Sequence, residues 1–123
     1  MVRPSCPALV IHEDDAFRKK LIAALDVSHF SVTVAEDGDG AIELLSTRKF
    51  NVVLIGLDLA AHKGMRSTGY LQREKSSLHC GVLILGESNP ELRTFAPWAD
   101  ETLLKPVDPA YVAARAQSYC DCN

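Results

Sequence analysis

Five short apolar segments, separated by stretches with helical periodicity, constrain the fold of this 123-residue chain more than any other feature. The segments are residues 8–11, 31–35, 51–57, 81–85 and 101–104. Strands that alternate with helices in this way are typical of βαβ units and a parallel sheet. The segments in the middle of the chain are apolar without period-two alternation, as expected of central strands covered by helices on both faces. We therefore expect an α/β protein with a doubly wound parallel sheet of strand order 2-1-3-4-5.

Three of the intervening stretches predict helices with one apolar face. Residues 17–25 and 41–45 repeat apolar side chains at helical spacing. The last helix has Asp108 as a candidate N-cap and Pro109 at its first position. These three helices would lie on the sheet.

The other two connections are less regular. Residues 59–68 show little periodicity and predict a long loop, which a short third helix follows near residues 69–76. Pro90 can begin a fourth helix, but Pro97 would interrupt or end it. We expect the fourth helix to be stunted.

Composition favours a single packed domain and argues against nucleic-acid-binding and membrane proteins. The length and the 47% of apolar residues suit one packed domain over residues 1–123. The net charge of −3 argues against direct nucleic-acid binding, which needs clustered Lys and Arg. No apolar run approaches the roughly 18 residues that a membrane span needs. We expect a cytoplasmic protein that has no membrane segment.

The four cysteines are irregularly spaced, at Cys6, Cys80, Cys120 and Cys122. A chain of this size folds without disulfides, so we expect free thiols. The Cys120-Asp121-Cys122 motif offers two metal ligands where structural zinc needs four.

Acidic side chains and a lysine are expected to meet at one edge of the sheet. His12, Glu13, Asp14 and Asp15 directly follow the first strand, and Lys105 follows the fifth. The carboxyl ends of the strands of a doubly wound sheet converge at its switch point. Carboxylates suit a hard cation such as Mg²⁺, and a lysine can pair with a phosphoryl group. The pattern indicates a phosphoryl site.

The order and spacing of these stretches resemble the receiver domain of bacterial response regulators. The matching stretches are residues 8–18, 34–45, 50–55 and 99–108, which span nearly the whole chain. The resemblance implies a three-layer, flavodoxin-like (βα)5 fold and a non-enzymatic signalling role. In this family an acidic pair holds Mg²⁺ and an aspartate ending the third strand accepts the phosphoryl group. A Ser or Thr on the fourth strand, an aromatic residue on the fifth and a lysine complete the switch.

The acidic and acceptor positions of that switch are altered in this chain. The acidic pair falls on His12 and Glu13, with Asp14 next, so one acid is replaced. The acceptor position falls on Gly56, which has no side chain to phosphorylate. Asp58 is an alternative acceptor on the same face of the strand, but about 6 to 7 Å further along it.

The remaining switch positions are also changed, apart from the lysine. The hydroxyl position falls on Gly86 and the aromatic position on Thr102, whereas Lys105 is retained. Loss of acceptor, hydroxyl, aromatic residue and half of the metal pair predicts a receiver that does not work by phosphorylation. In this respect the chain is similar to the pseudo-receivers of gliding-motility regulators.

Structural roles can account for the polar residues that remain. Glu13 and Asp14 can cap and complement the positive end of the first helix, and Lys105 can neutralise nearby carboxylates. We expect no metal cofactor, with Glu13 and Asp14 as the candidates for any weak cation binding. Gly56 and Gly86 allow close backbone approach, so we expect the pocket to be collapsed or filled by neighbouring side chains.

The resemblance also implies a partner surface on the fourth helix, fifth strand and fifth helix. Aromatic and Arg residues, which are enriched at binding hot spots, fall on this surface. They are Arg93, Phe95, Trp98, Tyr111 and Arg115. The expected partner is another signalling protein or an output domain, with a homodimer through the same face as a further option. Alternatively, the two aromatics before residue 100 belong to the core and Arg115 is a solvated charge.

Three functional hypotheses remain open. The first is a phosphorylation-independent module that acts through protein contacts. The second is a phosphoreceiver that uses Asp58. The third is a thiol- or metal-responsive sensor that uses Cys120, Cys122 or His62.

Overall fold

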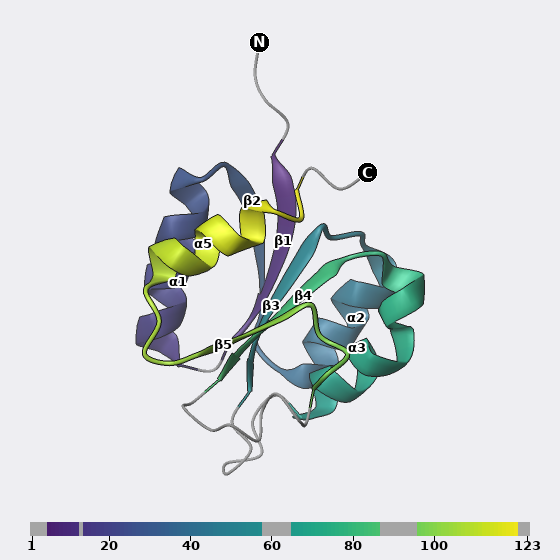
Figure 1. Ribbon diagram of the computed structural model, residues 1–123. Helices are drawn as coiled ribbons and strands as arrows, with labels where there is room; N and C mark the ends of the chain where they lie inside the picture. Colours follow the sequence, from purple (N-terminus) through teal and green to yellow (C-terminus); the bar gives the residue numbers. More distant parts are fainter. Residues whose placement is uncertain (1–4, 13, 58–64, 87–95, 121–123) are drawn as a thin grey trace.

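The computed structural model describes residues 5–12, 14–57, 65–86 and 96–120, and these contain a parallel sheet of five strands (Figure 1). The order of the strands across the sheet is β2-β1-β3-β4-β5. The predicted α/β flavodoxin-like topology is therefore confirmed. The strands are β1 (Cys6–Ile11), β2 (Phe30–Ala35), β3 (Val52–Leu57), β4 (Gly81–Gly86) and β5 (Glu101–Leu104).

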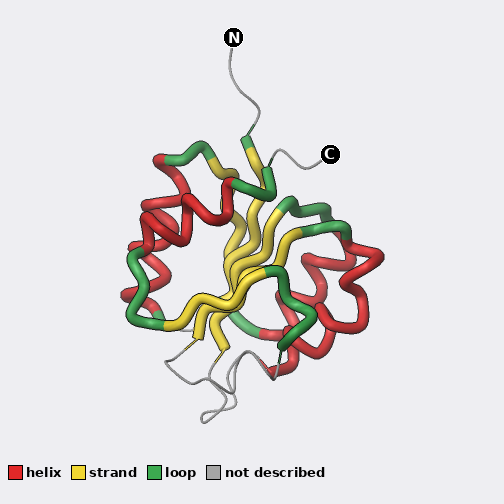
Figure 2. Tube along the Cα trace, viewed as in Figure 1, coloured by secondary structure: helices red, strands yellow, loops and turns green. Residues whose placement is uncertain are grey.

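Helices cover both faces of the sheet. They are α1 (Asp15–Val27), α2 (Gly38–Thr47), α3 (Met65–Leu78) and α5 (Pro109–Gln117). Helices α1 and α5 lie on one face and α2 and α3 on the other (Figure 1). Figure 2 shows the resulting layers, with red helices on either side of the yellow strands.

The sheet divides the core into two buried clusters. Successive side chains of a strand point to opposite faces. Leu9 and Val53 therefore pack with α2 and α3, whereas Val10 and Leu54 pack with α1 and α5. All four side chains are fully buried. Both faces of the central strands are apolar because both are covered, as the sequence pattern predicts.

Aspartate caps begin three of the helices. The Asp37 side chain accepts a hydrogen bond from the backbone N–H of Gly40 at 2.7 Å, and Asp108 accepts one from Ala110 at 2.9 Å. Asp14 caps α1 in the same way. The predicted cap at Asp108, followed by Pro109 in the first turn, is confirmed.

The third helix is longer than predicted. Residues 65–68, which the sequence analysis assigns to a loop, form the first turn of α3. Ser67 and Thr68 are buried there, together with Leu71. Buried hydroxyl side chains on this inner face hide the apolar periodicity from which a helix is recognised.

Residues 87–95, on which the predicted fourth helix falls, lie outside the described residues. Residues 97–100 form a turn and bend that lead into β5. None of the described helices is both long and apolar enough to cross a membrane.

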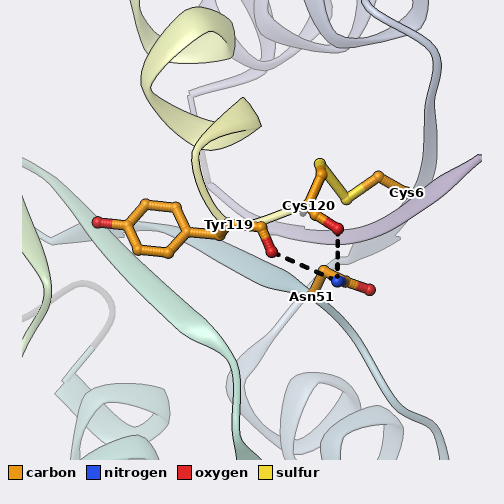
Figure 3. The surroundings of a disulfide bond; sticks show 4 residues. All are labelled: Cys6, Asn51, Tyr119 and Cys120. Carbon is orange, nitrogen blue, oxygen red and sulfur yellow. Dashed lines mark hydrogen bonds between the residues drawn. A yellow bond between two sulfur atoms is a disulfide. The ribbon is translucent and has the colours of Figure 1, made fainter. Parts of the chain in front are cut away.

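The prediction of free thiols is wrong for two cysteines. Cys6 and Cys120 form a disulfide, with their Cα atoms 5.6 Å apart, although 114 positions separate them in the sequence (Figure 3). The pairing arises because α5 runs back across the sheet and its end meets the start of β1. Cys80 is free and buried, and burial raises the pKa of its thiol. Cys122, like His62 of the sensor hypothesis, lies outside the described residues.

Candidate functional site

The carboxyl edge of the sheet brings His12, Gly56 and Lys105 together. The parallel register pairs Ile11 of β1 with Ile55 of β3, so His12 emerges level with Gly56. Lys105 directly follows β5, and its backbone N–H donates to the carbonyl of Gly86 at 2.7 Å. Three positions of the predicted pocket are thus neighbours in space.

The ring of His12 lies where a side chain on Gly56 would begin. A Cβ atom built on Gly56 would lie 2.6 Å from Cδ2 and 2.9 Å from Cγ of His12. These distances are well below van der Waals contact, and His12 is only 7% exposed. Any larger residue at position 56 would therefore require His12 to move. His12 and Gly56 therefore fit each other sterically.

Lys105 and Phe17 hold the His12 ring in place. The Nε2 atom of His12 lies 2.9 Å from Nζ of Lys105, and Nδ1 accepts a hydrogen bond from the backbone N–H of Asp14 at 3.1 Å. The His12 and Phe17 rings are 5.0 Å apart at their centroids. Nζ of Lys105 also lies 4.5 Å from the centroid of Phe17, within the range of a cation–π interaction.

Phe17 and Arg18 also contact His12, although the sequence did not indicate either of them as part of the pocket. Phe17 is counted there only as part of an apolar stripe. Nη1 of Arg18 donates to the carbonyl of His12 at 2.8 Å and so anchors the end of β1 to α1. Their position in the first turn of α1, close to His12 in the sequence, is the signal that could have indicated these roles.

Asp14 and Asp15, which follow β1, interact with residues of the first turns of α1. The Asp14 carboxylate caps α1 by accepting from the backbone N–H of Phe17 at 3.1 Å. This hydrogen bond lowers the pKa of Asp14, and the nearby charge of Lys105 lowers it further. Asp15 forms ion pairs with Arg18 and Lys19. Glu13 lies outside the described residues.

The described residues of this edge do not fit Mg²⁺. That cation needs several oxygen ligands in octahedral geometry. At the expected position the described groups are the imidazole of His12 and the ammonium of Lys105, 2.9 Å apart, while the Asp14 carboxylate serves as a helix cap. Among the described residues, no group of three His, Cys, Asp or Glu side chains could hold a metal ion.

The other residues assigned to the pocket are placed in part. Gly86 is buried at the end of β4, and Thr102 is partly buried in β5 opposite Ile84. Asp58, the alternative acceptor, lies outside the described residues.

The residues assigned to a partner surface fall into different environments. Tyr111 is 53% exposed on α5. Trp98 is partly buried against the core beneath α2 and α3, and its Nε1 has no hydrogen-bond partner among the described residues. The Arg115 side chain is 43% exposed, and its Nε donates to Glu101 at 2.8 Å, so this charge is both solvated and paired. Arg93 and Phe95 lie outside the described residues.

Glu101 links β5 to the end of α5. Besides the bond from Arg115, it accepts a hydrogen bond from the Tyr119 hydroxyl at 2.6 Å. Burial opposes ionisation of Glu101, but the hydrogen bonds from Arg115 and Tyr119 outweigh it and lower its pKa. Burial and the adjacent carboxylate raise the pKa of Tyr119. No local pattern in the sequence indicates this network.

Comparisons with known proteins agree with this architecture. Residues 8–117 match the model of the family described as response regulator receiver domain. The transcriptional activator protein PfeR of Pseudomonas aeruginosa is 29% identical over 115 residues, which are 94% of this chain and 38% of PfeR. The chain therefore spans well under half of that relative.

Solved receiver structures show the same fold. A CheY-like receiver domain protein from Methanospirillum hungatei superposes with a TM-score of 0.80 at 19% identity, covering 96% of this chain and 95% of that one. The receiver domain of the Francisella response regulator 1452 gives a TM-score of 0.79 at 21% identity, covering 94% and 96%.

Proposed function

This chain belongs to the response-regulator receiver domain family of two-component signalling, and we propose that it is a pseudo-receiver, which signals through protein contacts without being phosphorylated. The observation that carries the proposal is the His12 ring, which occupies the space at Gly56 where the family's acceptor side chain would begin. An aspartate and a bound Mg²⁺ cannot share this space with the ring. Lys105, whose family role is to contact the phosphoryl group, contacts His12 and Phe17.

The direct test is exposure to small phosphodonors. With Mg²⁺ and either acetyl phosphate or beryllofluoride, we expect no added phosphoryl mass and no change in the amide spectrum. A receiver that retains its acceptor aspartate serves as the positive control under the same conditions.

The phosphoreceiver hypothesis makes the opposite prediction. Phosphoryl incorporation that disappears in Asp58→Ala would show that the acceptor has moved along the chain, and would overturn the proposal. Incorporation elsewhere would overturn it as well.

We place the partner contact on β5 and α5, around Tyr111, and expect a signalling protein or an output domain to bind there. An aromatic side chain that is 53% exposed on a helix otherwise anchored to the core suits an interface hot spot. The family's signalling role and the net charge of −3 favour a cytoplasmic protein with no direct nucleic-acid contact.

Tyr111→Ala tests this surface. We expect it to weaken binding to a cognate partner by roughly tenfold or more, since hot-spot truncation costs about 2 kcal/mol. Val27→Ala is the matched control, because Val27 is 79% exposed on α1, away from β5. Equal loss in both variants, or none in Tyr111→Ala, would contradict the placement. Sedimentation of the wild type would show whether the partner is a second copy of the chain.

A further inference from the structure

The segment after α5 lies across the amino ends of three strands, at the edge opposite the degenerate pocket. Cys120 is bonded to Cys6, the first residue of β1. Asn51, which precedes β3, donates from Nδ2 to the carbonyls of Tyr119 and Cys120 (Figure 3). The Tyr119 ring covers Gly81, the first residue of β4, where a Cβ atom would lie only 2.3 Å from the ring.

Tyr119 and Cys120 are held by different interactions. The Tyr119 hydroxyl donates to Glu101 at 2.6 Å, and its ring packs on the backbone of β4. Besides the disulfide, the Cys120 carbonyl accepts a hydrogen bond from Asn51 at 3.4 Å, and the Cys120 N–H donates to the carbonyl of Gln117 at 3.1 Å. The covalent bond is therefore the main tie between residue 120 and β1.

The two sulfur atoms are placed for reversible chemistry. Cys6 and Cys120 are both partly buried at the end of the sheet, whereas the free Cys80 is in the core. A Cα separation of 5.6 Å lies in the usual range for disulfides, so the folded chain brings the thiols together without rearrangement. In a reducing compartment, disulfides are typically transient or redox-sensing.

We propose that Cys6 and Cys120 are a thiol–disulfide modification site for small-molecule disulfides of the glutathione class, whose state sets whether residue 120 is tied to β1. This role goes beyond the proposed function, because it uses the opposite edge of the sheet from His12 and Gly56.

The exchange is balanced in two steps. The thiolate of one cysteine attacks glutathione disulfide, forming a mixed disulfide and expelling one glutathione thiolate. The second cysteine then attacks the protein sulfur of that mixed disulfide, which forms the Cys6–Cys120 bond and expels the second glutathione. Two protein thiols are oxidised and one glutathione disulfide is reduced to two thiols, and the two protons lost by the protein thiols are taken up by the two expelled glutathione thiolates. Excess reduced glutathione reverses both steps.

The experiment measures the redox state and the local structure together. The full chain is equilibrated in buffers of varied glutathione to glutathione-disulfide ratio, quenched with acid, alkylated and weighed by mass spectrometry. We expect Cys6 and Cys120 to pass from alkylated to bonded within this series. In hydrogen exchange, the amides of Tyr119 and Cys120 should exchange at least tenfold faster in the reduced form, while those of β3 and β4 should stay far slower than these two, because the fold persists.

Single-cysteine variants separate this site from the other thiols. Cys6→Ser and Cys120→Ser should both show the fast exchange at every ratio, whereas Cys80→Ser and Cys122→Ser should retain the transition. A bond that never forms, one that resists excess reduced glutathione, or one that requires Cys122 would overturn the proposal. Unchanged exchange on reduction would also overturn it. The result of the phosphodonor experiments does not depend on the state of the disulfide. Failure of the thiol–disulfide proposal can therefore be distinguished from failure of the pseudo-receiver proposal.

Discussion

At the scale of single residues, His12 and Gly56 make sense only as a pair. A glycine at the end of a buried strand would leave space beneath the sheet edge, and an imidazole fills it. The ring then lies in contact with the Asp14 amide, the Phe17 ring and Lys105 on three sides. The imidazole fills the space that the glycine leaves, as close packing in protein interiors requires.

A double-mutant cycle tests this pairing. Gly56→Ala should lower the free energy of unfolding by about 1–3 kcal/mol, because the added methyl group overlaps the buried His12 ring. In the His12→Ala background the same substitution should cost at least about 1 kcal/mol less, since the obstructing ring is gone. Urea unfolding of the four proteins gives the coupling.

Gly69→Ala is the control for the loss of glycine. A Cβ atom there would meet Arg73 at an ordinary 3.6 Å, within α3. This variant should be more stable than wild type by about 0.5–1 kcal/mol, as expected for glycine replaced inside a helix. Additive effects in the His12 and Gly56 cycle would contradict the steric account.

At the scale of elements, one carboxylate connects an edge strand to the last helix. The carboxylate of Glu101 in β5 accepts one hydrogen bond from Arg115 of α5 and another from Tyr119 in the turn that follows α5. The strand is short and partly exposed along its length, so side-chain bonds add to its four-residue ladder with β4. The network also holds Tyr119 over Gly81.

The lowered pKa of Glu101 gives this network a defined pH dependence. The folded protein favours the ionised form, so the stabilisation is fully present above the unfolded pKa of about 4.3 and is lost as the pH falls through the lower folded value. Glu101→Gln should therefore destabilise the protein by about 1 kcal/mol near neutral pH, a modest value because Arg115 is 43% exposed. The difference from wild type should shrink towards acid pH.

Denaturant unfolding of wild type and Glu101→Gln from neutral to acid pH measures this trend. Tyr119→Phe keeps the ring on Gly81 but removes the hydroxyl bond, so part of the same dependence should remain. A difference between wild type and Glu101→Gln that is constant with pH would show that the carboxylate charge is not involved.

At the scale of the whole molecule, the disulfide joins the two ends of the described chain. It links β1, the second strand across the sheet, with the segment after α5, and encloses nearly every element between them (Figure 1). A cross-link that closes so long a loop removes much conformational entropy from the unfolded state.

Reduction of this bond should lower the free energy of unfolding by about 2–5 kcal/mol without changing the fold. Unfolding in denaturant with and without dithiothreitol measures the loss, and circular dichroism of the reduced form checks the secondary structure. Cys6→Ser should match the reduced wild type and be insensitive to reductant. The effect of reductant on Cys80→Ser should equal that on wild type, and a smaller effect would implicate the buried thiol instead.

The order and type of the elements were predictable because hydrophobic periodicity and helix caps are local. The five apolar segments and the cap at Asp108 depend on neighbouring residues alone, and all appear in the structure. The start of α3 was not predictable in this way, since buried Ser67 and Thr68 look like loop residues until their surroundings are known.

By itself, the sequence determined the doubly wound sheet and predicted that the acceptor position falls on Gly56. The tertiary structure decided what lies beside Gly56, because the parallel register of β1 and β3 sets His12 next to it. It likewise decided that Cys120 pairs with Cys6, across 114 positions, and that Glu101 binds Tyr119. Contacts of this kind depend on how distant elements pack, and no local pattern records that packing.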